Sequence, residues 1–232
     1  MDYKQIRAQA RQNLKESWGL SIGVAAVAVL LGGLIQGSVF LPDYSADIPY
    51  GFLRELTALL NDGIRFGDLT FSIRNGIIGI VAFIVGGAVQ LGHARFLLNQ
   101  HDKQEIKFDQ LFSQFHRFGQ GFAQKFLRGL YITLWTLCLV IPGIMAAYSY
   151  SMTPFLMAED ENLTASEAIT RSKEMMRGHR MEMFVLDLTF IGWKILCAIT
   201  ANLGFLLLNP YTSAAHAVFY RQLQQKAYLP EF

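Results

Sequence analysis

Residues 19–41 form a run of 23 residues without a charged side chain. A second run of 23, residues 76–98, contains a single Lys or Arg, Arg95, close to its end. A helix needs about 20 apolar residues to cross the hydrocarbon core of a bilayer, whereas runs of about 10–14 suit buried helices. Both runs therefore predict transmembrane helices, although hydrophobic residues make up only 52% of the 232-residue chain, a share close to that of soluble proteins.

Two further apolar runs, residues 130–157 and 182–223, are longer than one span requires. The first has 28 residues, so a continuous helix would be about 42 Å long. Pro142 and Gly143 interrupt it and predict either one kinked helix or a tight hairpin of two short spans, because Pro and Gly suit the central positions of a turn. In the second run the expected turn lies at Asn202 and Gly204.

The distribution of basic residues favours the hairpin interpretation. With six spans, 16 of the 20 Lys and Arg residues lie inside and three outside; with four spans, 12 lie inside and seven outside. Cytoplasmic segments are rich in Lys and Arg, so we expect about six spans, four being the alternative, with both termini cytoplasmic. The third span, residues 126–141, is then only about 24 Å long. The predicted fold class is all-α: residues 1–232 form one integral membrane domain, a polytopic transmembrane helical bundle with interfacial amphipathic helices.

Three segments outside the predicted spans have recognisable patterns. Residues 1–18 place apolar side chains at helical spacing among Lys and Arg, which predicts a basic interfacial helix on the cytoplasmic surface. Residues 42–75 contain five acidic residues and are predicted to form an outer loop. In residues 99–125 Phe recurs at intervals of three or four, which predicts an aromatic interfacial helix, with a partner-binding face as the alternative.

A helix-start signal lies within residues 159–180. Thr164 is followed three residues later by Glu167, the spacing of a capping box in which each side chain bonds the other residue's backbone N–H. Gly178 is suited to the position just after a helix ends. The segment therefore predicts a capped cytoplasmic helix that runs to about residue 177, with the side of Ala168 and Ser172 packed against other helices.

Several short stretches follow one another in an order that resembles a known family. They are LGHARF at 91–96, KFDQLFSQF at 107–115, IPGI at 141–144, YSYSMTP at 148–154, AITRS at 168–172, FIGW at 190–193 and NPY at 209–211. From about residue 87 to 223 the chain resembles an uncharacterised bacterial integral membrane family, domain of unknown function 975. More weakly, it is similar to the membrane region of some glycerophosphodiester phosphodiesterases, without their catalytic domain. The resemblance implies six membrane helices and no established activity.

Polar residues inside the predicted spans are the candidate site residues, because ionisable groups in a membrane usually have a function or a partner. They are Asp187, Lys194, Asn202, Asn209 and His216. We expect Asp187 to bond either the hydroxyl-rich stretch 148–153 or a basic residue of the cytoplasmic helix. We expect Asn209 to bond backbone freed by Pro210. His216, among small residues, fits helix packing or, alternatively, a proton relay.

The sequence shows no recognised catalytic motif, and the predicted extramembrane segments are too short for an independent domain. We therefore predict a non-enzymatic membrane protein that binds a lipid, a peptide or a partner protein, without a cofactor. A small transporter or channel using the membrane-embedded polar residues is the alternative, and an intramembrane enzyme the second. Predicted partners are the bilayer and another membrane protein or a second copy. The net charge of +2 and the lack of a nucleic-acid motif predict no nucleic-acid partner. The predicted location is the bacterial cytoplasmic membrane.

Overall fold

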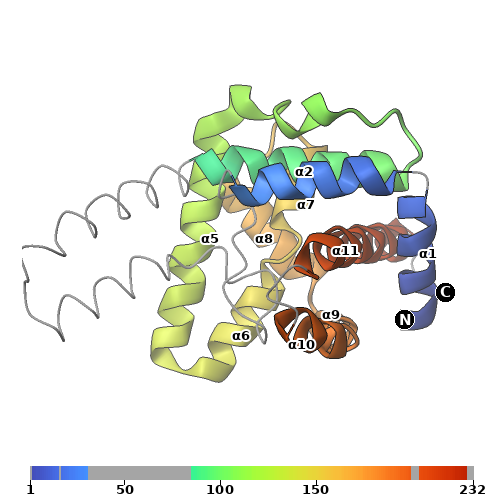
Figure 1. The fold of residues 1–232 in the computed structure, drawn as a ribbon. Coiled ribbons are helices and arrows are strands. Elements are labelled where there is room, and N and C mark those ends of the chain that lie inside the picture. The colour runs from blue at the N-terminus through green and yellow to red at the C-terminus, as the bar shows by residue number, and fades with distance from the viewer. Residues whose placement is uncertain (1, 16, 31–84, 200–203, 229–232) are drawn as a thin grey trace, which may run out of the picture.

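The protein is described by a computed structural model over residues 2–15, 17–30, 85–199 and 204–228. Within these ranges the regular elements are helices and there are no strands, which confirms the all-α prediction. The α-helices are α1 (Tyr3–Lys15), α2 (Trp18–Leu30), an unlabelled helix at 85–101, α5 (Phe118–Cys138), α6 (Val140–Ser149), α7 (Thr153–Glu159), α8 (Ala165–Met175), α9 (Arg180–Leu188), α10 (Ile191–Ile199) and α11 (Phe205–Tyr228). Figure 1 shows α11 near the centre, with α1, α2 and α10 around it.

The predicted spans 19–41 and 76–98 lie partly outside the described residues, and the predicted outer loop 42–75 lies wholly outside them. In the described part of the chain, no helix combines the length and the apolar character that crossing a membrane requires.

The run 130–157 is a hairpin and not one kinked helix. α6 packs along α5, and the two meet at an acute turn in Figure 1. The chain turns at Leu139, whose extended backbone (φ −162°, ψ 143°) ends α5 and precedes α6. The turn is therefore three residues earlier than Pro142. Pro142 is the third residue of α6, where a missing N–H costs little because the first N–H groups of a helix have no partner within it.

Gly143 has a different role from the turn residue that the sequence suggested. A Cβ atom at Gly143 would collide with the Thr136 side chain and would lie 2.7 Å from the Cα of that residue. Glycine at this position therefore lets α6 approach the backbone of α5. The hairpin prediction is right, but its turn and its close contact are at different residues.

The predicted aromatic helix in residues 99–125 is wrong as a single element. After the helix at 85–101, the chain forms two short 3₁₀ helices, η2 (Phe108–Leu111) and η3 (Phe115–Arg117). α5 then begins at Phe118 and continues for 21 residues, about 31 Å. The aromatic repeat thus crosses from two 3₁₀ turns into a long helix, because spacing alone does not mark where a helix starts.

α5 and the helix at 85–101 cross at two glycines. A Cβ atom added to Gly121 would lie 2.9 Å from the backbone N of Ala88 and from the backbone C of Gly87. One added to Gly87 would collide with the backbone of Gly121 in return. The two backbones are therefore in direct contact at this crossing, and there is no room for a side chain at Gly87 or Gly121.

The N-terminal helix has the amphipathic pattern that the sequence predicts. Its apolar residues Ile6, Ala10 and Leu14 are fully buried, and α1 packs against α11. The apolar side therefore meets protein in this structure, and the basic side chains of Lys4 and Lys15 are exposed. The side of this helix that stays exposed is therefore its charged side.

Candidate functional site

Asp187 near the end of α9 and His216 in α11 form a buried hydrogen-bonded pair. His216 Nε2 lies 2.8 Å from Asp187 Oδ1, and both side chains are more than nine-tenths buried. A buried carboxylate is costly unless it is paired or hydrogen-bonded. The contact therefore ties the fifth predicted span to the last one. The second carboxylate oxygen, Oδ2, is buried and has no hydrogen bond among the described residues.

The partner expected for Asp187 was wrong. The Ser and Thr hydroxyls of the stretch 148–153 bond backbone carbonyls one turn earlier: Ser149 donates to Met145 at 2.6 Å, Ser151 to Tyr148 at 2.8 Å and Thr153 to Tyr150 at 2.8 Å. Such local acceptors compete with distant ones for Ser and Thr hydroxyls. These Ser and Thr hydroxyls therefore have acceptors of their own, and Asp187 is hydrogen-bonded to His216 on α11 instead.

The other candidate residues do not join this pair. α9 ends at Leu188 and α10 begins at Ile191, so Asp187 and Lys194 lie on different helices. Lys194 is half-buried and makes no ion pair within the described ranges. Asn202 lies outside those ranges.

Asn209 and Pro210 are both buried inside α11, which continues past the proline. The backbone carbonyl of Asn209 accepts a hydrogen bond from the Thr212 hydroxyl at 3.0 Å. Between residues that the structure describes, Asn209 makes no side-chain hydrogen bond to the backbone near Pro210, so the role expected for its amide is not seen.

A second polar cluster, which the sequence reasoning missed, surrounds Glu159 at the end of α7. Tyr220 donates to Glu159 Oε2 at 2.5 Å, and Arg221 Nη1 donates to Oε1 at 2.6 Å. Gln224 donates to Oε2 at 2.5 Å. Arg221 also forms an ion pair with Asp102, which follows the helix at 85–101. The Glu159 carboxylate thus joins α7 to α11, and Arg221 extends the cluster to Asp102.

The protonation of Glu159 depends on this cluster. Burial by itself would raise the pKa of the carboxyl group, but the hydrogen bonds from Tyr220, Arg221 and Gln224 and the charge of Arg221 outweigh it. The pKa of Glu159 therefore lies below its ordinary value. The group is held as a carboxylate, which suits an anchoring role.

The two clusters share one side of α11. His216, Tyr220 and Gln224 are spaced by four residues, so they lie on the same side of the helix, about 6 Å apart along its axis at each step. This spacing was visible in the sequence, but Tyr220 and Gln224 were not recognised because they lie beside the basic residue that marks the end of the span. This side of α11 therefore carries an imidazole, a phenol and an amide, which bind protons or donate hydrogen bonds.

Within the described part of the chain, no group of three His, Cys, Asp or Glu side chains is placed to hold a metal ion. Cys138 is exposed and Cys197 is buried, and both are free thiols.

Comparison with known families identifies the part of the chain that carries these clusters. Residues 136–227 match the family described as protein of unknown function (DUF975). The resemblance to this family is confirmed over these residues, which begin later than the stretch from about 87 on which it was drawn. No curated protein matches the chain. No solved structure matches it either, and the likeness to phosphodiesterase membrane regions stays a resemblance.

The DUF975 segment, residues 136–227, contains the predicted capping box. Thr164 is the N-cap of α8: its hydroxyl accepts from the Glu167 amide at 3.4 Å, and the Glu167 carboxylate accepts from the Thr164 amide at 3.0 Å. These bonds lower the pKa of Glu167. α8 ends at Met175, and Gly178 has φ +87°, the conformation that favours glycine after a helix.

Ser172 on α8 hydrogen-bonds backbone groups at the break between α6 and α7. Its hydroxyl donates to the carbonyl of Ser149, the last residue of α6, at 2.8 Å. It also accepts from the amide of Met152, which precedes α7, at 3.2 Å. A helix break leaves backbone groups without partners, and one fully buried hydroxyl satisfies two of them here.

Two arginines outside the DUF975 segment hold its α7 in place. Arg95 donates to the carbonyl of Ala158 at 2.7 Å, and Arg117 donates to that of Met157 at 2.9 Å. Both carbonyls are in the last turn of α7, where cations are stabilised by the helix dipole. The sequence reasoning counted these arginines as topology markers and missed this contact.

Proposed function

We propose that the chain is a multi-pass protein of the bacterial cytoplasmic membrane, with about six spans and both termini cytoplasmic. In this proposal it acts without enzymatic activity as a scaffold that binds a lipid, a peptide or a partner protein. The observation that carries the membrane location is an apolar outer surface on the α5–α6 hairpin and α10.

That surface consists of large side chains that a soluble protein would bury. The most exposed are Phe126, Leu130, Leu134, Trp135, Leu137, Leu139, Ile141 and Met145 on the hairpin, and Trp193, Ile195 and Leu196 on α10. Their exposed fractions range from 42% to 83%. Many large apolar side chains exposed on the same two elements favour a membrane or protein contact.

The basic residues support the proposed orientation. Arg171, Lys173 and Arg177 are exposed on and just after α8. Cytoplasmic loops carry an excess of such residues. With α8 in the cytoplasm, the turn at Leu139 faces the outside, which fits six spans rather than four.

The Asp187–His216 pair supports a scaffold over a transport path. A path requires polar groups that meet water or substrate, whereas these two buried side chains meet each other and join α9 to α11. The specific observation favouring a small transporter or channel, the second candidate, is the buried Oδ2 of Asp187, which lacks a hydrogen bond within the described ranges. Such an oxygen is suited to accept a proton.

Topology is tested by labelling single cysteines with an impermeant thiol reagent in a protein without Cys138 and Cys197. Ser113 and Thr170 are exposed, so Ser113→Cys and Thr170→Cys should react only after the membrane is permeabilised. Ser45→Cys, in the predicted outer loop, should react in intact cells. Labelling of Thr170→Cys from outside would replace six spans by four. Ser172 is unsuitable for this test because it is fully buried.

Scaffold and transporter are separated with proteoliposomes that contain a pH-sensitive dye. A scaffold should hold an imposed pH gradient as well as protein-free vesicles do. Asp187→Asn should fold, since the amide keeps one hydrogen bond to His216, while Asp187→Leu should fold poorly because it leaves the histidine buried without that partner. A leak present in the natural protein and lost in the folded Asp187→Asn variant would establish transport and overturn the scaffold.

A further inference from the structure

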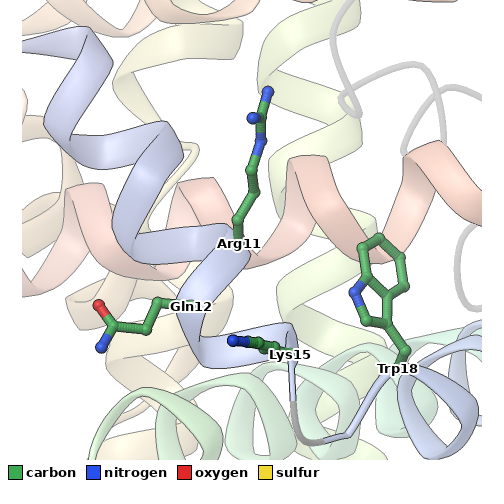
Figure 2. Close-up of a pocket in the computed structure, with 4 residues that line it drawn as sticks. All are labelled: Arg11, Gln12, Lys15 and Trp18. Carbon is green, nitrogen blue, oxygen red and sulfur yellow. The ribbon is translucent and has the colours of Figure 1, made fainter.

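The strongest unassigned feature is a basic hollow where α1 meets α2. It has a volume of about 580 Å³ and is lined by Arg11, Gln12, Lys15 and Trp18. Figure 2 shows Arg11, Gln12 and Lys15 extending from α1 and Trp18 from the start of α2, with the indole nitrogen on the side facing Lys15. The lining thus combines two cations, an amide and an aromatic N–H donor.

Arg11 is already fixed in place before any ligand binds. Its Nε donates to the Tyr211 hydroxyl at 3.0 Å, and its guanidinium carbon lies 5.5 Å from the centre of the Tyr211 ring. The hydrogen bond to Tyr211 uses only the Nε–H group of Arg11. The two Nη groups stay available, and they can bind two oxygens of an oxyanion at once. A preformed cation of this kind loses little conformational freedom on binding.

Lys15 and Trp18 complete the donor set. Lys15 is exposed and forms no ion pair with any residue that the structure describes, and the indole N–H of Trp18 has no acceptor there either. Trp18 is half-buried, and its ring packs against the core. Its position is the first residue of α2, at the start of the uncharged run 19–41. Trp and Lys at the end of an apolar helix are typical of the headgroup level.

We infer that this hollow is a binding site for a phosphate monoester or diester anion, and that the anion is the headgroup of an acidic phospholipid such as phosphatidylglycerol. The inference rests on the proposed membrane location and specifies which class of lipid the scaffold binds. Arg11 and Lys15 supply two positive charges at the hollow, and the Trp18 indole N–H lies on the side facing Lys15. A headgroup with its own cation is disfavoured, since that cation would meet Arg11 and Lys15.

The site is tested with the full chain in nonionic detergent, using Trp18 as the reporter. Trp135→Phe and Trp193→Phe remove the other two tryptophans, which are about half exposed, so their loss should not unfold the protein. Dihexanoyl-phosphatidylglycerol should change the Trp18 fluorescence in a saturable way, and dihexanoyl-phosphatidylcholine should bind at least about tenfold more weakly. Equal affinity for the two lipids would overturn the inference.

A matched pair of variants separates the site from general charge. Lys15→Gln and Lys4→Gln each remove one exposed positive charge from α1, but only Lys15 lines the hollow. Lys15→Gln should weaken binding of the acidic lipid about tenfold, the effect of one charge-assisted hydrogen bond, and Lys4→Gln less than about twofold. Equal losses would show attraction by net charge alone and no site.

Soluble anions distinguish the two sources of phosphate. Inorganic phosphate and glycerol phosphate should bind much more weakly than the lipid, because acyl chains along α2 add apolar contact. If either binds as tightly as the lipid, the site serves a free phosphate and the lipid assignment is wrong. Failure of the membrane proposal is a separate result: the protein would then be recovered without detergent, whatever its affinity for phosphate.

Discussion

The α5–α6 hairpin and the α7–α8 pair are consecutive in the chain, yet they are stabilised in different ways. The hairpin points Leu134 and Leu137 outward and makes its contacts through a small residue, Gly143, against the backbone of its neighbour. The α7–α8 pair points its apolar side chains inward. Side-chain hydrogen bonds satisfy the last turn of α7, from Arg95 and Arg117, and the start of α8, from Thr164.

This difference indicates two kinds of surroundings. A helix end in water or in protein is satisfied by hydroxyls and cations, as at Thr164, Ser172 and Arg117. A large exposed apolar surface marks a contact with a membrane, as we propose for the hairpin, or with another protein. The boundary between the two regions lies near residues 149–152, where α6 ends and Ser172 bonds across the break. Each prediction below probes one side of this boundary.

The largest expected effect comes from placing a charge on the hairpin. Leu134→Lys should cost about 3 kcal/mol in membrane insertion, the scale measured for a Lys near the centre of a span. Thr170→Lys places the same charge on the exposed surface of α8 and should change stability by less than about 0.5 kcal/mol. Both are measured as the inserted fraction in membrane preparations, and similar values would remove the distinction between the two regions.

Gly121→Ala probes the side of α5 that packs against the helix at 85–101. The new methyl group would meet backbone atoms of Gly87 and Ala88 that do not move easily, so unfolding in mixed detergent should become easier by about 2 kcal/mol. Gly119→Ala, two residues earlier in α5, has nothing within 4 Å of the new atom. It should leave stability unchanged or raise it by about 0.5 kcal/mol. A harmless Gly121→Ala would contradict the close crossing.

On the other side of the boundary, Ser172→Ala removes the hydroxyl that joins α6 to α7. The Ser149 carbonyl and the Met152 amide would lose this partner, at a cost of about 1.5 kcal/mol in unfolding free energy. Thr170→Ala on the exposed side of α8 is the control, because its hydroxyl bonds only the preceding turn. Equal melting temperatures for the two variants would show that Ser172 does not bridge the break.

The capping box predicts a smaller loss. Thr164→Ala should reduce the unfolding free energy by about 1 kcal/mol, the usual effect of losing an N-cap. Thr164→Ser keeps the hydroxyl and should be nearly neutral. Thermal denaturation in detergent measures both, and an Ala variant as stable as the Ser variant would place the start of α8 elsewhere.

The smallest effect is a pH dependence. The pKa of Glu167 is lowered in the folded protein, first by the Thr164 backbone N–H and then by the Thr164 hydroxyl. Its stabilising contribution is therefore present above the pKa of an unfolded glutamate and is lost as the pH falls through the lowered value. Glu167→Gln has no such titration, so its stability difference from the natural protein should shrink between neutral and strongly acidic pH. A difference independent of pH would show that the Glu167 carboxylate is not part of the cap.

The sequence by itself was sufficient for features that depend on neighbouring residues. The helix type, the buried side of α1, the cap formed by Thr164 and Glu167, and the glycine after α8 follow from residues a few positions apart. Interactions within one or two turns depend little on how helices are arranged, because the local backbone sets their geometry.

Tertiary structure alone decided which polar groups meet. Asp187 and His216 are 29 positions apart, and Tyr220 and Glu159 are 61 positions apart. The turn at Leu139 also depends on α6 packing against α5, since Pro142 is compatible with the first turn of a helix. Such contacts arise only when separate helices are brought side by side, and a hydroxyl that finds an acceptor in its own turn, as Ser149 does, is no longer free for a distant carboxylate.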